Sequence, residues 1–408
     1  MAGVSVLEGH KDRVWHVCWT HTGETLASCG GDKTVRLWQR KPTLAAGEEG
    51  GDDGTATASG GDAEYLCAET LEGTHTKTIR RCEFSTCDTM IASVSFDATT
   101  CVWDKTSQGE VSRRVPELGD PRRILSPTRG TDVLSLSLCL SLSLALALSP
   151  SFRLCGVRTP CTQKWDLVVT LEGHESEVKN LAWSPCGELL ATCGRDKSIW
   201  IWLKEIDDQF ECLDVLQGHT QDIKSLVWVP GTRALVSASY DNTIRVWNEV
   251  SDEWLCTQTL DGSYQGHETT VWGLACDARG ERVLSCDGEG MILLWSTEIS
   301  AEDKSVELGL VSRNKVPSAS AVYSIDWSPS GMVAIGSANN SICLLQVERD
   351  GDGETEGEGR EVLRLVREIT EAHHGDVNCV RFNPTRPALL ASGGDDETVK
   401  VWNLDEVI

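Results

Sequence analysis

The stretch HESEVKNLAWSPCGELLATCGRDKSIWIW, from His174 to Trp202, decides the fold because its pattern returns along the whole chain. A histidine opens the pattern, an acidic residue follows 22 positions later, and a tryptophan stands six positions after the acid. Four further copies keep both spacings and begin at His10, His75, His219 and His267. The copy that begins at His373 is one residue longer, and a degenerate copy lies between Val322 and Leu345. Self-similarity at a fixed period is the signature of a repeat architecture.

Within each copy, short runs of alternating apolar and polar residues are separated by turn residues, which is typical of β-strands. The run Ser198-Ile199-Trp200-Ile201-Trp202 after the turn at Gly194-Arg195-Asp196 is one example. Seven copies of about 42 residues, each a four-stranded blade, can be arranged radially so that few strand edges are exposed. The sequence therefore predicts an all-β protein, a single seven-bladed β-propeller over residues 1–408.

The ends of the chain predict how the ring closes. Only six residues follow Trp402, too few for an outer strand and its turn. Residues 4–7 precede the first Gly9-His10 as an outer strand precedes every other copy. We therefore expect the N-terminal strand to complete the last blade.

The Gly-His start and the Asp and Trp near the end of each copy resemble the WD-repeat β-propellers. In such propellers the histidine, a hydroxyl four residues before the acid, the acid and the tryptophan form a buried hydrogen-bonded chain, which this resemblance implies here. Buried polar groups need such partners. The expected sets are His10, Ser28, Asp32 and Trp38; His75, Ser93, Asp97 and Trp103; His174, Thr192, Asp196 and Trp202; His219, Ser237, Asp241 and Trp247; His267, Ser285, Glu289 and Trp295; and His373, Ser392, Asp396 and Trp402. The sixth copy has Ser318, Asn339 and Leu345 in place of histidine, aspartate and tryptophan, so we expect its blade to be the weakest.

Composition narrows the class of protein. The formal charge of −25, from 37 basic and 62 acidic residues, argues against a nucleic-acid binder. No run approaches the roughly 20 apolar residues of a membrane span. Seventeen scattered cysteines in a chain without a secretory leader predict free thiols in a reducing compartment, the cytoplasm.

Three insertions follow the strand-end position of a copy, which is Trp38, Trp103 or Leu345. Residues 39–62 and 348–360 are acidic, Gly-rich segments that predict solvated loops. Residues 105–164 form a low-complexity insertion in which Leu134 to Leu148 alternates leucine with Ser, Cys or Ala. Since a CT-repeat tract encodes Leu-Ser runs, one hypothesis is a translated intron, and the alternative is a genuine disordered loop. We expect all three insertions on the face opposite to the binding face described below.

Two strings are more specific than a generic repeat: residues 95–103, SFDATTCVW, and residues 193–198, CGRDKS. They resemble the cytosolic iron–sulfur protein assembly family, from which the sixth repeat and residues 105–164 depart. The resemblance implies a non-catalytic scaffold without a cofactor, in the cytoplasm and also the nucleus, that docks client apoproteins and partner subunits for [4Fe-4S] cluster delivery. The implied partners are a cytosolic iron–sulfur assembly component 2-type carrier, a helical-repeat adaptor, an iron-only-hydrogenase-like protein, and clients that include chains ending in an aromatic residue.

One face of such a propeller is lined by the residue before each turn acid and by the residue after the first-strand Val or Ile. The basic and aromatic residues at these positions are Arg195, Arg80, Lys179, Lys224, Tyr240, Phe96, Trp15, Trp272 and Tyr323, with Asn378 beside them. An arginine can hold a carboxylate through two hydrogen bonds while aromatic neighbours receive an apolar side chain. Arg195 matches the family's functionally important arginine on this face. The alternative is that these are ordinary rim residues.

Other functions fit the sequence less well. No CxxC motif occurs, and Cys18, Cys29, Cys193 and Cys379 fall inside strand patterns, so we expect no cluster ligation by this chain. A substrate receptor of a ubiquitin ligase often carries Trp-Asp-x-Arg after a blade, but residues 103–106 read WDKT. An enzyme would need a catalytic constellation outside the repeat frame, and none is present.

Overall fold

The computed structural model describes residues 3–41, 65–106, 164–205, 208–264, 266–316, 320–350 and 360–407. Residues 1–105 and 165–408 form one compact unit. The second unit, Thr106–Lys164, falls almost wholly outside the described residues, as does most of the two acidic segments. The predicted placement of the three insertions therefore concerns residues outside the described ranges.

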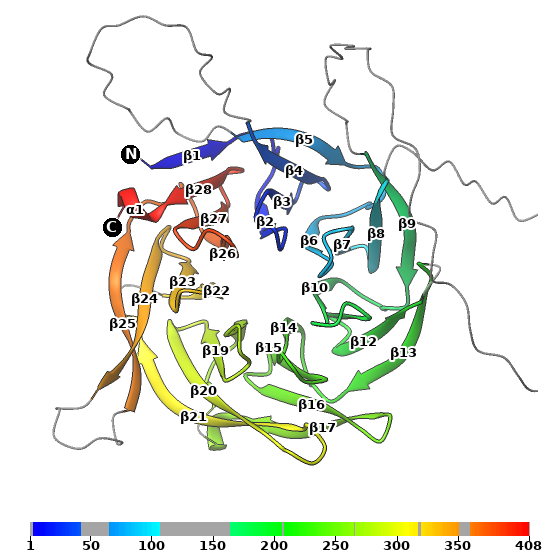
Figure 1. Cartoon of the computed structure of the whole chain (residues 1–408), viewed down its shortest axis with the longest axis vertical. Helices are drawn as coiled ribbons and strands as arrows, with labels where there is room; N and C mark the ends of the chain where they lie inside the picture. The colour runs from blue at the N-terminus through cyan, green and yellow to red at the C-terminus, as the bar shows by residue number, and fades with distance from the viewer. Residues whose placement is uncertain are drawn as a thin grey trace, which may run out of the picture. The chain divides into compact units, whose positions relative to one another are not determined.

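The compact unit contains seven four-stranded antiparallel sheets, which confirms the seven-bladed β-propeller (Figure 1). Blade 1 comprises β2 (Val14–Trp19), β3 (Thr25–Gly30), β4 (Val35–Arg40) and β5 (Tyr65–Leu71). Blade 2 comprises β6 (Ile79–Phe84), β7 (Met90–Ser95), β8 (Thr99–Thr106) and β9 (Lys164–Glu172). Blade 3 comprises β10 (Val178–Trp183), β11 (Leu189–Gly194), β12 (Ser198–Lys204) and β13 (Phe210–Gln217). Blade 4 comprises β14 (Ile223–Trp228), β15 (Ala234–Ser239), β16 (Ile244–Val250) and β17 (Glu253–Leu260).

The remaining blades follow the same order from the inside of the ring outward. Blade 5 comprises β18 (Val271–Cys276), β19 (Arg282–Asp287), β20 (Met291–Ile299) and β21 (Val306–Lys315). Blade 6 comprises β22 (Val322–Trp327), β23 (Met332–Ser337), β24 (Ile342–Asp350) and β25 (Arg360–Ile369). Blade 7 comprises β26 (Val377–Phe382), β27 (Leu389–Gly394), β28 (Val399–Asn403) and β1 (Val4–Leu7). Two short helices complete the described structure, η1 (Gly262–Tyr264) and α1 (Leu404–Val407).

The N-terminal strand closes the ring as the sequence predicts. β1 pairs antiparallel with β28, with Val4 opposite Trp402 and Leu7 opposite Val399. The N- and C-terminal ends of the chain consequently lie side by side at one blade (Figure 1). Blade 7 is therefore built from both ends of the chain.

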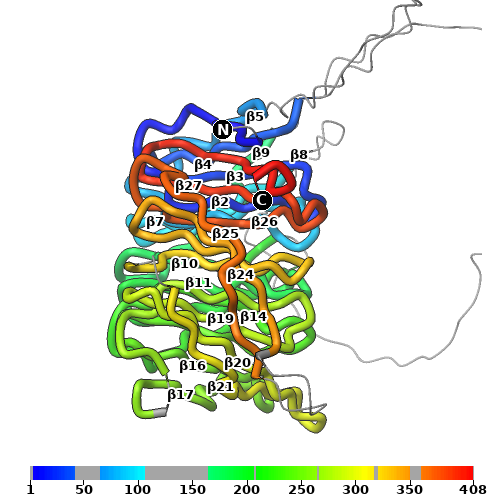
Figure 2. Tube along the Cα trace, turned by 90° about the vertical axis from the view of Figure 1, so that its left-hand side faces the viewer, coloured from blue at the N-terminus to red at the C-terminus, as the bar shows by residue number. Residues whose placement is uncertain are grey.

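The hydrophobic core lies between the blades. In blade 3, every residue of the second strand β11 is buried, whereas half of the residues of the outer strand β13 are exposed. Each core cluster draws on two adjacent blades, as when Cys18 and Cys29 of blade 1 pack with Ile79 and Phe84 of blade 2. Seven such clusters follow one another around the ring. Figure 2 shows the backbone of the ring from the side. Within the described ranges, no helix has the length and apolar character needed to cross a membrane.

Candidate functional site

The repeat histidines sit in buried hydrogen-bonded chains. In blade 3, His174 Nδ1 lies 2.6 Å from Asp196 Oδ2, and its Nε2 lies 2.9 Å from Thr192 Oγ1. The indole N–H of Trp202 donates to the same Thr192 oxygen at 2.9 Å. A carboxylate can only accept, so His174 Nδ1–H donates to Asp196 while Nε2 faces the Thr192 hydroxyl.

The same arrangement recurs around the ring. The distance from histidine Nε2 to the hydroxyl is 2.7–2.9 Å in all six motif-bearing blades. The tryptophan indole donates to that hydroxyl at 2.8–2.9 Å in the blades of Trp38, Trp202, Trp247, Trp295 and Trp402. Trp103 is buried with its ring 6.2 Å from the ring of His75. These chains join the start, middle and end of each repeat and so fix the blades that carry the candidate binding face.

The prediction for Glu289 is wrong. His267 Nδ1 contacts Asp287 Oδ2 at 2.9 Å, and the side chain of Glu289 is exposed. The turn keeps its register, because Gly290 has a φ of 78° where Lys197 of blade 3 has 68°. The backbone N–H groups of Glu289 and Met291 donate to Asp287 Oδ1 at 2.9 Å each, which leaves Oδ2 for the histidine. An aspartate where blade 3 has Gly194 was the signal that could have found this substitution.

The sixth blade replaces the polar chain by apolar packing. Leu345 and Ile335 are buried in one hydrophobic cluster with Val333 and Cys343. Asn339 accepts hydrogen bonds from the hydroxyls of Ser337 and Ser341. Ser318 lies outside the described residues. The relative weakness of this blade stays a prediction.

Seven of the nine predicted face residues surround one hollow on the ring axis, which we call the axial depression. It has a volume of about 250 Å³. Its predicted lining residues are Trp15, Arg80, Phe96, Lys179, Lys224, Trp272 and Tyr323, with Asn378. All except Phe96 are the second residue of an innermost strand, and together they come from all seven blades. The repeat therefore places one side chain per blade at this depression.

Aromatic rings hold the cations of the axial depression. The Arg80 guanidinium lies 4.9 Å from the Trp15 ring centre and donates to the Trp15 carbonyl oxygen at 3.2 Å. Burial lowers the pKa of Arg80. Among the described residues, no carboxylate forms an ion pair with it. A cation over a ring in a partly dry site keeps charge available for an anionic ligand.

A second cationic group lies across the depression. Lys224 Nζ is 4.7 Å from the Trp272 ring centre and 5.1 Å from that of Tyr240. Burial and the nearby charge of Lys179 lower the pKa of Lys224 to about 8. Asp222 Oδ2 lies 2.5 Å from Lys179 Nζ and 3.9 Å from Lys224 Nζ, so one carboxylate serves two lysines.

Arg195 and Tyr240 lie outside the axial depression. Arg195 is 59% exposed, and its guanidinium is 3.3 Å from Glu177 Oε1. The other oxygen of Glu177 is 3.5 Å from Lys179 Nζ, which connects Arg195 to the depression through one glutamate. Tyr240 is 48% exposed and reaches the depression only through Lys224.

Acidic residues, which the sequence analysis missed, are interleaved with the cations. Glu177 and Asp222 pair with lysines, and Asp376 and Asp395 line the depression beside Arg13. Glu177, Asp222 and Asp376 each stand directly before the first Val or Ile of an innermost strand. The position directly before the first Val or Ile is a third repeat position on this face. Considering it together with the other two would have found these acidic residues. The face therefore has mixed charge, with aromatic rings and cations at its centre.

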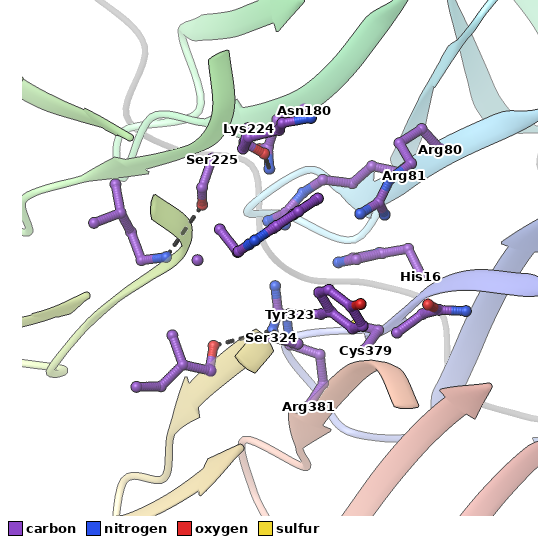
Figure 3. Close-up of a pocket in the computed structure, with 15 residues that line it drawn as sticks. His16, Arg80, Arg81, Asn180, Lys224, Ser225, Tyr323, Ser324, Cys379 and Arg381 are labelled. Carbon is purple, nitrogen blue, oxygen red and sulfur yellow. Dashed lines mark hydrogen bonds between the residues drawn. The ribbon is translucent and has the colours of Figure 1, made fainter. Parts of the chain in front are cut away.

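A smaller hollow of about 30 Å³ adjoins the depression, and we call it the inner cavity (Figure 3). Its lining includes His16, Arg80, Arg81, Lys224 and Arg381. His16 extends toward the cavity near Arg81 and Cys379 (Figure 3). The sequence analysis gave His16 no role.

Comparisons with known proteins agree with this architecture. A family model described as "WD domain, G-beta repeat" matches seven segments, residues 3–39, 66–104, 165–202, 210–248, 255–296, 313–345 and 364–403. A protein of Chlamydomonas reinhardtii named "Probable cytosolic iron-sulfur protein assembly protein CIAO1 homolog" is 35% identical over 98% of this chain and 97% of its own length. A protein of Caenorhabditis elegans with the same name is 32% identical over 98% of this chain and 97% of its own length. A protein of Vanderwaltozyma polyspora named "Probable cytosolic iron-sulfur protein assembly protein 1" is 32% identical over 98% of each chain.

Proposed function

The chain belongs to the WD-repeat family of cytosolic iron-sulfur protein assembly proteins, and from this membership we propose that it is a non-catalytic docking scaffold of that machinery. In this proposal it holds client apoproteins and partner subunits together while a [4Fe-4S] cluster is delivered. A propeller alone does not name a function, so the proposal rests on the site as well as on the family.

The observation that carries the proposal is the axial depression. At about 250 Å³ it lies below the usual 300–1,000 Å³ of a pocket for a drug-sized ligand, and it suits one side chain with its adjoining backbone. Trp272 and Tyr323 pack edge to face with ring centres 5.2 Å apart and offer an apolar wall. Arg80 and Lys224 supply positive charge beside that wall. A chain that ends in an aromatic residue combines the two groups that this site receives, an apolar ring and a carboxylate.

Arg195 has a different place in the proposal. Its exposed guanidinium stands on the same face, next to the depression, and shares Glu177 with Lys179. Exposed ion pairs contribute little to stability, so Arg195 can exchange its partner at small cost. We assign it to the capture of acidic groups on the client before the tail enters the depression.

The partners in this proposal are those of the family. They are a cytosolic iron–sulfur assembly component 2-type carrier, a helical-repeat adaptor, an iron-only-hydrogenase-like protein and the client apoproteins. The named relatives are cytosolic proteins, and we place this chain in the cytoplasm and, for clients that act there, in the nucleus.

Affinity purification from cells tests the proposal. We expect the wild-type chain to recover iron–sulfur apoproteins, and Arg195→Glu to recover several-fold less client while its thermal unfolding is unchanged. Arg233→Glu is the matched control, because Arg233 is 51% exposed and also pairs with glutamates, Glu249 and Glu188, but lies at the β14–β15 turn at the other end of the strands. Equal recovery of clients by the Arg195→Glu and Arg233→Glu proteins would remove Arg195 from the site. Failure of the wild-type chain to recover any iron–sulfur protein would contradict the scaffold function itself.

A further inference from the structure

Three potential metal ligands meet between blades 1 and 2, next to the inner cavity. His16 and Cys18 come from β2, and Cys82 comes from β6. One ligand atom of each residue lies within 4.8 Å of the others, and all three residues are buried. The two Sγ atoms are 3.9 Å apart. We call this group the interblade cluster.

The sequence explains why the cluster forms. Side chains two positions apart in a strand share a face, so His16 and Cys18 point the same way while Val17 points the other way. Val17 accordingly packs in the cluster between blades 1 and 7, whereas Cys18 and Cys82 pack between blades 1 and 2. Two thiols and an imidazole are thus brought together between these blades.

The buried side chain of His16 points to a bound ligand. Its exposed fraction is 3%, and neither ring nitrogen makes a hydrogen bond of good geometry with any described residue. Every histidine of the hydrogen-bonded chains has both nitrogens paired. A buried polar group without a partner costs about 1–3 kcal/mol, so such a ring nitrogen calls for a bound group.

We propose that His16, Cys18 and Cys82 form a mononuclear zinc site that links blade 1 to blade 2. Two thiolates bound at about 2.3 Å to a tetrahedral zinc ion stand about 3.8 Å apart, close to the observed 3.9 Å. One imidazole and two thiolates are three ligands, and a water molecule completes the tetrahedron. The inner cavity, which His16 lines, has room for that water molecule beside the cluster.

Arg80, Arg81 and Arg381 line the inner cavity together with His16, so the ligands themselves must balance the charge of a bound zinc ion. On binding, each thiol gives its proton to solvent, and the two thiolates balance the charge of the zinc ion. The zinc ion and its two thiolates are then neutral together and add no net charge beside the arginines.

Zinc titration of the full-length protein tests the site. Accessible thiols, among them Cys67, Cys186 and Cys256, are first blocked by alkylation of the folded protein, and bound metal is removed with a chelator. We expect one tightly bound Zn²⁺ per chain in competition with a chromophoric chelator. Co²⁺ in its place should give thiolate charge-transfer absorption and the intense visible bands of a tetrahedral ion.

A substitution tests each of the three proposed ligands. Cys18→Ala, Cys82→Ala and His16→Leu should each weaken zinc binding by roughly 100-fold or more, since even outer contacts of a metal site are worth 10–100-fold. Cys193→Ala, which removes a fully buried thiol from blade 3, should bind zinc like the wild type. Zinc should raise the unfolding temperature of the wild type and of Cys193→Ala only.

His16→Leu keeps the test decisive if a cysteine variant does not fold. Leucine removes the unpaired ring nitrogens, so the metal-free His16→Leu protein should be at least as stable as the metal-free wild type. Retention of stoichiometric zinc by folded His16→Leu would overturn the site. Absence of zinc binding by the wild type, or loss of two hydrogens in its mass through a Cys18–Cys82 disulfide, would overturn it as well.

Discussion

Each hydrogen-bonded chain places a histidine between a hydroxyl and a carboxylate in the interior of the ring. Such a chain matters for stability because removing one member leaves a neighbouring polar group buried and unpaired. In blade 5 the carboxylate belongs to Asp287, which is 3% exposed and also accepts two backbone hydrogen bonds. The turn residue Glu289 contributes its backbone and not its carboxylate.

Replacing Asp287 by alanine should therefore destabilise the protein while replacing Glu289 should not. We expect Asp287→Ala to lower the free energy of unfolding by about 1–3 kcal/mol, because His267 loses its acceptor. Glu289→Ala should stay within about 0.5 kcal/mol of the wild type, as for most exposed substitutions. Urea unfolding followed by tryptophan fluorescence measures both. A larger effect of Glu289→Ala would restore the glutamate as the partner of His267.

The carboxylates of the hydrogen-bonded chains also predict that the folded protein loses stability in acid. Burial alone would raise the pKa of Asp32, but hydrogen bonds and charge from His10, with help from Lys11 N–H and Thr34, lower it to about 2 from 3.8. A pKa that is lower in the folded protein than in the unfolded chain gives stability that is present above pH 4 and is lost as the pH falls toward 2.

Asp32→Asn isolates this contribution. The variant should be less stable than the wild type by about 2 kcal/mol at pH 7, and the difference should shrink as the pH falls from 4 to 2. Unfolding temperatures of both proteins measured over this range give the comparison. A difference that is constant with pH would show that the Asp32 charge does not stabilise the fold.

Single residues also show what the repeat pattern can and cannot predict. The pattern located Trp15, Arg80 and Lys179 at the axial depression, because a fixed position in a repeat becomes a fixed position in the ring. It missed Asp287 because counting by spacing gives the position of the turn and not the reach of a side chain. It missed His16 because the neighbour of that ring across the interface, Cys82, is distant in sequence.

At the scale of elements, the short strand β1 closes the ring. It has four residues, pairs over its whole length with β28, and buries Leu7 to 4% exposure. Without it, the edge of β28 would expose unpaired backbone groups, which is a hazard for association.

Deletion of residues 1–8 tests this closure. We expect the unfolding temperature to fall by roughly 5 °C or more, since a paired strand and the burial of Leu7 are lost together. Size-exclusion chromatography should also show oligomers formed through the free edge of β28. Val6→Thr, on the half-exposed side of the same strand, is the control and should behave like the wild type. An unchanged unfolding temperature after the deletion would mean that the ring holds without its N-terminal strand.

Blade 6 shows that a blade can form without the polar chain. Its alternating apolar residues build four strands, and Leu345 and Ile335 pack where the other blades have tryptophan and a hydroxyl. Apolar packing is less directional than a hydrogen-bonded chain, so the blade should open more readily.

Hydrogen–deuterium exchange can rank the blades. We expect amides of β23 and β24 to exchange at least several-fold faster than those of β11 and β12, the equivalent strands of blade 3. Comparison of equivalent strands removes the effect of position within a blade. Equal protection would show that the apolar cluster of blade 6 replaces the polar chain without loss.

At the scale of the whole molecule, seven hydrophobic clusters of described residues hold neighbouring blades together. Seven equivalent interfaces follow from seven copies of one pattern, which is why the architecture was predictable from the sequence. The long segment between β8 and β9 has no counterpart in this pattern. Blade 3 joins the corresponding strands with residues 205–209, and blade 4 does so with Ser251 and Asp252.

The propeller should therefore fold without residues 107–163. We propose to replace them with residues 205–209 of blade 3, EIDDQ, which connect the equivalent strands β12 and β13. Closing a shorter loop costs less entropy on folding. We therefore expect the free energy of unfolding to rise by about 2 kcal/mol. The unfolding temperature should be equal to or above that of the full chain, and the recovery of clients should be equal. If the shortened protein fails to fold or loses its clients, the segment is a working part of the protein and the translated-intron hypothesis is wrong.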